Sequence, residues 1–412
     1  MIYDLVVVGG GAAGFFGAIQ TAEHFPGASI LILEKSNKLL SKVKVSGGGR
    51  CNVTHACFTP SEMIAHYPRG SKELLGPFHQ FLCGDMMEWL ENNNVSTKIE
   101  EDGRVFPLSD SSQSIIDCFL WACQKHSINI EHHAQVQSFK KKETFFELNY
   151  KDTSLQTKSI LWTTGSSPKA WDVLKKSGLC IIDPVPSLFT FNIQSALLDG
   201  LMGLSLTNVQ VQIQLENTQF DAQGPLLITH WGLSGPAVLK LSAWAARELH
   251  AVDYNFQISV NWIAQNEHEC LAYLNRVKSE NGKLKVKKLR PFQLPRRLWE
   301  RMVSLWQIEG KNMADLSNSE LEQMASDLSG WQFNVNGKST FKEEFVTCGG
   351  VDLKEINFKH MESKKIPGLY LAGEVINIDA ITGGFNFQAA WTESFIAGRS
   401  IAERIALNSE GE

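Results

Sequence analysis

The alternation of short apolar runs with turn residues predicts a strand–helix–strand unit at the start of the chain. Residues 3–8 (YDLVVV) form a β-branched apolar run of the length typical of a buried parallel strand. Residues 12–24 carry small and apolar side chains at helical spacing, and residues 29–33 (SILIL) form a second apolar run.

The glycines between the first strand and the helix have the spacing of a dinucleotide-binding turn. Gly9, Gly11 and Gly14 follow the pattern G-x-G-x-x-G, and Glu34 ends the second strand. Such glycines permit a tight turn, a close approach of the backbone to a pyrophosphate, and close packing of helix on strand. The helix N-terminus offers N–H groups to phosphates, and the carboxylate can accept the ribose hydroxyls. Because an acidic residue disfavours a 2′-phosphate, the pattern predicts FAD or NAD rather than NADP.

Two later segments favour FAD over NAD. Residues 35–54 hold a second glycine cluster, Gly47 to Gly49, which suits an enzyme that wraps an extended FAD and which a simple NAD dehydrogenase does not need. Residues 367–374 (PGLYLAGE) predict a turn and a buried strand, and residues 379–388 (DAITGGFNFQ) place a glycine pair before a segment of helical spacing. That helix can direct its positive end at the pyrimidine side of the isoalloxazine and stabilise negative charge there.

The residues expected to bind FAD come from these segments and from residues 160–165 (ILWTTG), a predicted strand that ends in a small-residue turn. They are Gly9, Gly11, Ala12, Ala13, Gly14, Glu34, Lys35, Gly48, Gly49, Arg50, Cys51, Asn52, Thr164, Gly165, Gly373, Glu374, Asp379, Gly383, Gly384, Phe385 and Asn386.

Composition narrows the possible classes. The 412 residues are too many for one compact core, and the net charge of -5 gives no general field that would recruit nucleic acid. The eight cysteines contain no C-x-x-C pair, which argues against disulfide-reductase flavoproteins and predicts reduced thiols and no metal site. No stretch approaches the ~20 apolar residues of a membrane-spanning helix, so we expect a cytoplasmic protein without a membrane partner.

The middle of the chain predicts an inserted domain. Residues 189–193, 209–215 and 256–260 alternate or run apolar as strands do, and residues 267–329 turn helical and charged. A small β-barrel-like domain that carries a helical subdomain fits this pattern. Such a domain boundary would place a substrate cleft over the flavin.

Two features of this insert each allow two interpretations. His230 could donate a proton to substrate, or it could be hydrogen-bonded in a packed corner, which is the interpretation we favour. Residues 278–301 are rich in Lys and Arg and could bind an anionic partner such as RNA. The acidic chain and the lack of a stacking motif favour a solvated helical face instead, so we expect no nucleic-acid partner.

The chain resembles the BaiN-like bacterial FAD-dependent oxidoreductases, also described as aminoacetone-oxidase-family flavoproteins, over nearly its full length. The resemblance rests on GGGAAG (9–14), SGGGRCNVT (46–54), RVFPLSDSS (104–112), GPLLITHWGLSGPAVL (224–239), TCGGVDL (347–353) and LYLAGEVINIDAITGGFNFQAAW (369–391). It implies that N-terminal and C-terminal segments bind FAD around an insert. Some members of this family resemble reductases of conjugated enones in steroid-like substrates, and others carry an amine-oxidase label.

We therefore expect an α/β protein whose Rossmann-type, glutathione-reductase-like FAD-binding domain (residues 1–186 and 345–412) is interrupted by an inserted domain (residues 187–344). The insert is expected to be β-rich at residues 187–262 and 330–344 and helical at residues 263–329.

The expected function is that of an FAD-dependent oxidoreductase that reduces an electron-poor C=C bond of a small organic substrate through flavin N5. NAD(P)H is the expected transient electron donor, and His230 is the candidate catalytic residue. Three alternatives stay open: an amine oxidase that uses O2, a flavin-containing RNA-binding or RNA-modifying protein, and a flavoprotein without turnover that acts as a redox-responsive partner. The oligomeric state is left open.

Overall fold

The polypeptide folds into two units in the computed structural model, which describes residues 2–215, 218–339 and 346–409. The first unit contains residues 1–185 and 342–412, and the second contains residues 186–341. The expected boundary between residues 344 and 345 lies outside the described residues. The first boundary between the units lies within β10 (Ile181–Ser187), which pairs with β18 (Val346–Val351) of the first unit.

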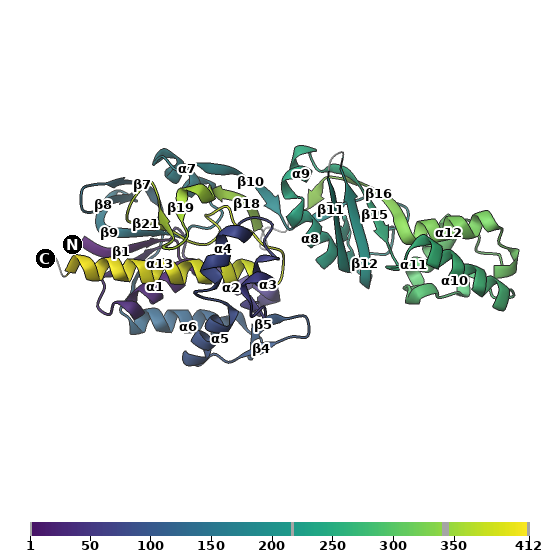
Figure 1. Ribbon diagram of the computed structural model, residues 1–412, viewed down its shortest axis with the longest axis horizontal. Coiled ribbons are helices and arrows are strands. Elements are labelled where there is room, and N and C mark those ends of the chain that lie inside the picture. The colour runs from purple at the N-terminus through teal and green to yellow at the C-terminus, as the bar shows by residue number, and fades with distance from the viewer. Residues whose placement is uncertain (1, 216–217, 340–345, 410–412) are drawn as a thin grey trace. The chain divides into compact units, whose positions relative to one another are not determined.

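A mostly parallel sheet forms the centre of the first unit (Figure 1). Its strand order is β19-β20-β21-β9-β1-β2-β6, and β21, β9, β1, β2 and β6 are parallel to one another. The hairpin partners β7 and β8 extend β9 as an antiparallel meander. The strands are β1 (Ile2–Val8), β2 (Ile30–Leu33), β6 (Asn129–Glu131), β7 (Val136–Lys141), β8 (Phe146–Tyr150), β9 (Thr153–Trp162), β19 (Ile356–Asn357), β20 (Glu362–Ser363) and β21 (Leu369–Leu371).

The register of this sheet aligns the carboxyl ends of its central strands. Val8 of β1 lies opposite Leu33 of β2 and opposite Trp162 of β9, and Trp162 in turn lies opposite Leu371 of β21. The residues that follow these four strands therefore meet at one edge of the sheet, which is where doubly wound folds bind their ligands. The turns that contain Gly9, Gly165 and Gly373 follow β1, β9 and β21 and lie at this edge.

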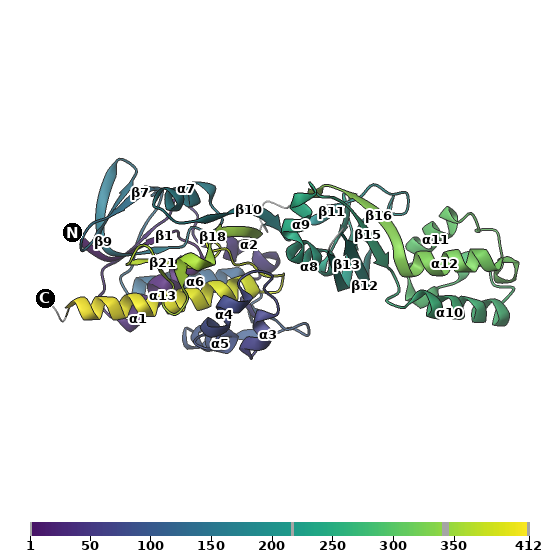
Figure 2. The same cartoon turned by 45° about the horizontal axis from the view of Figure 1, so that its top comes forward.

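Helices α1 (Ala12–His24) and α13 (Phe385–Ser409) lie side by side against the sheet (Figures 1 and 2). Their backbones approach closely at two glycines: a Cβ built on Gly398 would come within 2.8 Å of the carbonyl oxygen of Gly17. The remaining helices of this unit are α2 (Ser41–Gly49), α3 (Pro60–Ile64), α4 (Ser71–Phe78), α5 (Cys83–Asn92), α6 (Ser112–Lys125) and α7 (Pro168–Lys176). A small antiparallel sheet completes it, with the strand order β3 (Thr54–His55), β5 (Arg104–Pro107), β4 (Thr97–Ile99).

The second unit contains an antiparallel sheet that closes on itself. Its strand order is β16-β15-β12-β13-β14-β11-β17. The two outermost strands, β16 and β17, are successive parts of one segment, residues 331–339, which pairs with β15 and then with β11. This closure of the sheet by one segment is the structural basis of the predicted barrel-like character. The strands are β11 (Thr190–Asn192), β12 (Ser205–Gln214), β13 (Gln219–Ile228), β14 (Gly232–Ser234), β15 (Asn255–Asn261), β16 (Trp331–Asn336) and β17 (Lys338–Ser339).

A helical part extends this barrel, as Figure 1 shows within the second unit. Trp299, Met302 and Leu321 are buried in its apolar interior, which belongs to the same core cluster as the barrel. Its helices are α10 (Glu267–Glu280), α11 (Arg296–Leu305) and α12 (Asn318–Gly330), with the 3-10 turns η1 (Val286–Lys288), η2 (Pro291–Gln293) and η3 (Met313–Asp315). Two further helices, α8 (Pro236–Trp244) and α9 (Ala246–Ala251), belong to the same unit.

The predicted α/β class with a Rossmann-type unit is confirmed. Among the described residues, no helix combines the length and apolar character that crossing a membrane requires.

Candidate flavin site

The first glycine turn connects β1 to α1 and packs against the end of β9. Gly9 has φ of +115°, and a Cβ on it would come within 2.6 Å of the carbonyl oxygen of Thr163. A Cβ on Gly14 would come within 2.0 Å of the carbonyl oxygen of Gly9. The hydroxyl of Thr163 donates to the carbonyl groups of Val8 and Gly9, at 3.1 Å and 3.0 Å. Only glycine fits at positions 9 and 14 of this turn. Ala12 and Ala13 follow in the first turn of α1.

The carboxylate of Glu34 is held beside this turn. Its Oε2 atom accepts a hydrogen bond from the backbone N–H of Gly10 at 2.9 Å. Its Oε1 atom accepts from the backbone N–H and the hydroxyl of Ser36, at 2.9 Å and 2.8 Å. The group is buried at the end of β2, and the side chain of Lys35 is exposed next to it. A carboxylate fixed in this way is placed to accept hydrogen bonds from the hydroxyl groups of a ligand on the open side of the turn.

The second glycine cluster lies at the end of α2, where Gly48 and Gly49 are exposed. It breaks the end of α2, because Gly47, Gly48 and Gly49 all have left-handed backbones, with φ of +57°, +70° and +86°. Cys51 follows with φ of +63°. Its thiol is buried, and burial raises the pKa of Cys51 to about 12, so the thiol stays protonated at neutral pH.

The side chain of Arg50 contacts residues of the small sheet and of the segments next to it. Its Nη1 atom lies 2.6 Å from the carboxylate of Glu100 and 3.4 Å from that of Asp110. The guanidinium carbon lies 3.9 Å from the centroid of the Phe106 ring. The side chain thus has an internal, structural set of contacts, and the expectation that it binds FAD stays a prediction.

The C-terminal glycine pair meets the segment that follows the second cluster. Gly384 has φ of +93°, and a Cβ on it would come within 2.5 Å of the carbonyl oxygen of Thr54 and 2.9 Å of the Asn52 side chain. The indole of Trp391 in α13 donates to the carbonyl oxygen of Val53 at 2.9 Å. The hydroxyl of Thr54 donates to Gln388 at 2.6 Å. Two segments more than 300 residues apart in the sequence therefore form one structure at the start of α13.

Side chains on both sides of the glycine pair fix its path, Asn386 in the first turn of α13 and Asp379 before it. The amide group of Asn386 makes two hydrogen bonds to the backbone of Ala380, at 3.0 Å and 3.1 Å. Asp379 is completely buried and accepts from the Nε atom of Arg69 at 2.6 Å. Gly383 has φ of +129°.

The turns after β9 and β21 also converge on the start of α1. A Cβ on Gly373 would come within 3.1 Å of the Cβ of Ala13, and a Cβ on Gly165 would lie 3.8 Å from the carboxylate of Glu374. Glu374 forms an ion pair with Lys42 of α2. The hydroxyl of Thr164 accepts from the indole of Trp162 at 3.1 Å. The structure thus gathers all the predicted FAD-binding residues in the first unit.

This arrangement fits a dinucleotide. Apart from neighbouring backbone, no atom of the described residues lies within 4 Å of a Cβ built on Gly11, Gly48 or Gly49, so these three positions face open space. In the described structure, no side chain caps the N-terminus of α1, and the first turns of α1 and α13 contain no acidic residue. The N–H groups at the start of α1 are therefore available to an anionic ligand, and no acidic side chain in the first turn of α13 opposes negative charge there.

A cluster of histidines beside the C-terminal glycine pair was missed by the sequence interpretation. The ring of Phe385 stacks with the rings of His55 and His66, with centroids 4.5 Å and 4.1 Å away. The Nδ1 atom of His55 lies 3.1 Å from the carbonyl oxygen of Gly383, and the thiol of Cys57 lies 3.8 Å from the Nε2 atom of His66. Desolvation lowers the pKa of His55, which favours the neutral ring. The only signal in the sequence is that His55 directly follows the SGGGRCNVT segment.

The predicted catalytic residue, His230, belongs to the second unit. It lies between β13 and β14 and is exposed, so the interpretation that it is hydrogen-bonded in a packed corner is wrong. Its predicted role toward substrate stays a prediction. All eight cysteines lie in the described part of the chain, where none forms a disulfide; six are buried, Cys57 is partly buried and Cys180 is exposed.

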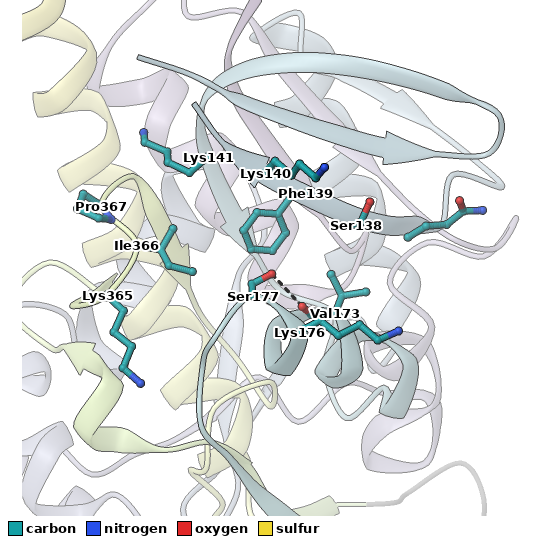
Figure 3. A pocket seen from close by; sticks show the side chains of 11 residues that line it. Ser138, Phe139, Lys140, Lys141, Val173, Lys176, Ser177, Lys365, Ile366 and Pro367 are labelled. Atoms are coloured by element: carbon teal, nitrogen blue, oxygen red, sulfur yellow. Dashed lines mark hydrogen bonds between the residues drawn. The ribbon is translucent and has the colours of Figure 1, made fainter. Parts of the chain in front are cut away.

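A surface pocket of about 450 Å³ lies elsewhere on the first unit (Figure 3). Lys140, Lys141, Lys176 and Lys365 line it together with Phe139, and the hydroxyl of Ser177 at its base donates to the carbonyl oxygen of Val173 at 2.9 Å. The predicted FAD-binding residues are not among those that line this pocket, so it is separate from the candidate flavin site.

Comparisons with known proteins place the chain in a family. A family model described as "HI0933-like protein Rossmann domain" matches residues 3–400. The ribosomal RNA dihydrouridine synthase of Escherichia coli is 29% identical over 408 residues, which cover 97% of this chain and 98% of that protein. The 3-dehydro-bile acid delta(4,6)-reductase of Clostridium scindens is 24% identical over 411 residues, again covering 97% and 98%.

Solved structures show the same fold at much lower identity. The 3-ketosteroid-delta4-(5alpha)-dehydrogenase of Rhodococcus jostii has a TM-score of 0.53 at 13% identity, covering 97% of this chain and 96% of that one. The fumarate reductase subunit FrdA of Escherichia coli has a TM-score of 0.51 at 12% identity, covering 99% and 71%. With the family match over most of its length, the chain belongs to the HI0933-like family and is an FAD-dependent oxidoreductase of the BaiN-like kind that its motifs indicated.

Proposed function

We propose that this protein reduces a C=C bond conjugated to a carbonyl group, with NAD(P)H as the electron donor. The observation that carries the proposal is the junction of the two glycine-bearing segments, where Gly384 packs on Thr54 and Asn52, which follow the second glycine cluster in the chain. The names of the two relatives support the direction of the reaction. A delta(4,6)-reductase of a 3-dehydro-bile acid and a dihydrouridine synthase both saturate a C=C bond conjugated to a carbonyl.

We assign the cofactor contacts by the physical character of each turn. Gly11 and the N-terminus of α1 are placed to bind the pyrophosphate, and Glu34 to bind the ribose of the adenosine. The N–H groups at Gly384 and Phe385 would stabilise negative charge on the pyrimidine side of the ring system. Bound FAD supplies two-electron transfer through flavin N5. In the overall reaction NAD(P)H is oxidised to NAD(P)+, and the C=C bond gains one hydride and one proton.

The proton has two candidate sources among the residues of this chain. His230 is exposed and belongs to the second unit, which we propose as the substrate-facing insert. His55 and His66 stack on Phe385, directly beside the proposed isoalloxazine turn. The variants His230→Gln and His66→Gln separate these sources, because loss of the proton donor slows reoxidation by substrate and changes its pH profile but leaves reduction by NAD(P)H intact.

The test of the proposal is an anaerobic reduction followed optically. The purified holoenzyme should show flavin absorbance, bleach with NADH or NADPH, and recover its colour when a 4-en-3-one steroid or a uridine-containing RNA is added. Recovery with O2 alone, after bleaching by an amine and not by a nicotinamide, would instead identify an amine oxidase and would overturn the proposal.

A second candidate substrate class is the uracil ring of RNA, whose C5=C6 bond is conjugated to the C4 carbonyl. Two relatives, from Escherichia coli and Haemophilus influenzae, are named as ribosomal RNA dihydrouridine synthases at 29% and 27% identity, and the chain covers 98% of each. One observation on this chain favours it: residues 278–301 expose a concentrated positive charge. Mass spectrometry of nucleosides after incubation of RNA with enzyme and NAD(P)H tests it, since reduction of uridine adds two hydrogen atoms.

A further inference from the structure

The second unit carries a local charge opposite to that of the chain. Residues 278–301 contain nine Lys and Arg and two Glu, a net charge of +7, whereas the whole chain has a net charge of -5. The other residues therefore sum to -12. Such an uneven distribution gives this segment a positive field, which can attract an anionic partner that the rest of the molecule repels.

The positive side chains are exposed above a packed base. Val286 and Leu289 are buried, whereas Lys287, Lys288 and Arg290, which alternate with them, are exposed. The indole of Trp299, itself completely buried in α11, donates to the carbonyl oxygen of Val286 at 2.9 Å. This hydrogen bond ties the η1 segment to α11, so the cations stand on a fixed surface.

Several of these cations lie together and are available for binding. The carboxylate of Glu300 is paired with Arg296 at 2.7 Å. This pairing lowers the pKa of Glu300, and the nearby positive charges of Lys287 and Arg290 lower it further. Among the described residues, the side chains of Lys283, Lys287, Lys288 and Arg290 form no hydrogen bond or salt bridge. We call the exposed residues Lys283, Lys287, Lys288, Arg290, Arg296 and Arg297 the basic surface.

An aromatic pair borders this surface. Phe292 lies between Arg290 and Arg296 in the chain and is partly exposed, and its ring centroid is 4.5 Å from that of Tyr273. Phe292 has φ of +52°, a left-handed backbone that is unusual for a bulky residue and is retained only where surrounding structure imposes it. Arg276 lies 5.7 Å from the Tyr273 ring. Cations next to a partly exposed aromatic ring offer both phosphate contacts and a stacking face.

We propose that the basic surface, with Phe292 at its border, is an RNA-binding surface that holds the sugar-phosphate backbone. This proposal rests on the second proposed substrate class, in which the enzyme reduces a uracil ring of RNA. It favours RNA over an anionic membrane for two reasons. Apart from Leu284 and Phe292, which are partly exposed, the large apolar residues of this segment are buried, which leaves little apolar surface to enter a bilayer. The partly exposed ring of Phe292 also suits stacking on a base.

The experiment measures binding of the full-length holoenzyme to a fluorescently labelled stem-loop RNA with uridines in its loop. The wild type is compared with the triple variant Lys287→Gln, Lys288→Gln, Arg290→Gln. The matched control is Lys140→Gln, Lys141→Gln, Lys176→Gln, which removes the same charge from the lysine-lined pocket of the first unit. Flavin absorbance and the melting temperature show that each variant is folded.

Removal of the three cations should weaken RNA binding at least about tenfold and should reduce the slope of log K against log salt by about two to three. The control should stay within about twofold of the wild type. Equal weakening in both variants, or no binding of the wild type at low salt, would overturn the proposal. So would binding to phosphatidylglycerol vesicles without binding to RNA.

The outcomes also separate this surface from the proposed reaction. If RNA binds through the basic surface but bound FAD is not reoxidised by it, the surface stands and RNA is not the substrate. If an RNA uridine is reduced equally well by the triple variant and the wild type, the reaction stands and the surface is not its docking site.

Discussion

Gly384 lies directly against Thr54: a Cβ on Gly384 would come within 2.5 Å of the Thr54 carbonyl oxygen, and its φ is +93°. This contact joins the C-terminal glycine pair to the segment after the second glycine cluster. A substitution to alanine must either strain the left-handed backbone or move the two segments apart.

The variant Gly384→Ala should therefore bind FAD at least about tenfold more weakly and lose about 1–3 kcal/mol of stability. Flavin content after purification and urea unfolding measure the two effects. Gly310→Ala is the control, because Gly310 is exposed and, among the described residues, no atom lies within 4 Å of its added Cβ. A Gly384→Ala protein with full flavin content and unchanged stability would show that the contact does not shape the site.

Much of this site could be predicted from the sequence because its parts are local. The turn at Gly9 to Gly14, the acidic residue at Glu34 and the strand before Gly373 each follow from spacing within a few tens of residues, and the structure places them at one edge of the sheet. The helical spacing of apolar residues, which begins at Ala389, also indicates the helix after Gly384. In the structure α13 begins four residues earlier, at Phe385.

The remainder depends on contacts between distant segments, which leave no local pattern. His66 and Phe385 stack across 319 residues of chain, and nothing in the spacing of either indicates the other. His230 was expected in a packed corner because it follows an apolar strand, but the strand ends at Ile228 and the loop exposes the ring. The closure of the barrel likewise depends on residues 331–339 pairing with two different strands.

Gly11→Ala should separate cofactor binding from folding. Gly11 has an extended backbone, with φ of -96°, and in the described structure a Cβ there meets only open space. The apoprotein should therefore lose no more than about 1 kcal/mol of stability, the cost of a poorer helix cap. FAD should bind at least about tenfold more weakly, because the added methyl occupies the space proposed for the pyrophosphate.

Isothermal titration of apoprotein with FAD measures this affinity, and thermal unfolding of the same preparation measures stability. The result contrasts with Gly384→Ala, in which both quantities change. Undiminished affinity in Gly11→Ala would place the pyrophosphate elsewhere.

Removal of Arg69 should destabilise the C-terminal glycine turn. Its guanidinium pairs with the completely buried carboxylate of Asp379, so Arg69→Met leaves a buried charge without its cation. Such a change costs about 3–5 kcal/mol, whereas breaking an exposed pair costs at most about 1 kcal/mol. Lys151→Met is the control, because its pair with Glu131 is largely exposed. Denaturant unfolding of both variants gives the comparison, and equal effects would contradict a special role for the buried pair.

The strongest pH dependence is expected from Glu393, which lies in α13 and is completely buried. Its Oε2 atom accepts from the backbone N–H of Gly373 at 2.6 Å, and its Oε1 atom has no hydrogen-bond partner among the described residues. Desolvation raises the pKa of Glu393 from 4.5 to about 8, so the folded protein keeps a proton that the unfolded chain releases.

A group whose pKa is raised by folding stabilises the protein most below its unfolded pKa, and this contribution is lost as pH rises toward the folded pKa. The free energy of unfolding should therefore fall between about pH 4.5 and pH 8 by up to about 5 kcal/mol from this residue alone. Glu393→Gln removes the titration but keeps the acceptor for Gly373, so its stability relative to wild type should rise with pH across that window. Urea unfolding at several pH values measures the slope. Glu403→Gln, an exposed site on the same helix, should keep the wild-type slope. A slope unchanged by Glu393→Gln would mean that the carboxyl is already ionised in the folded protein.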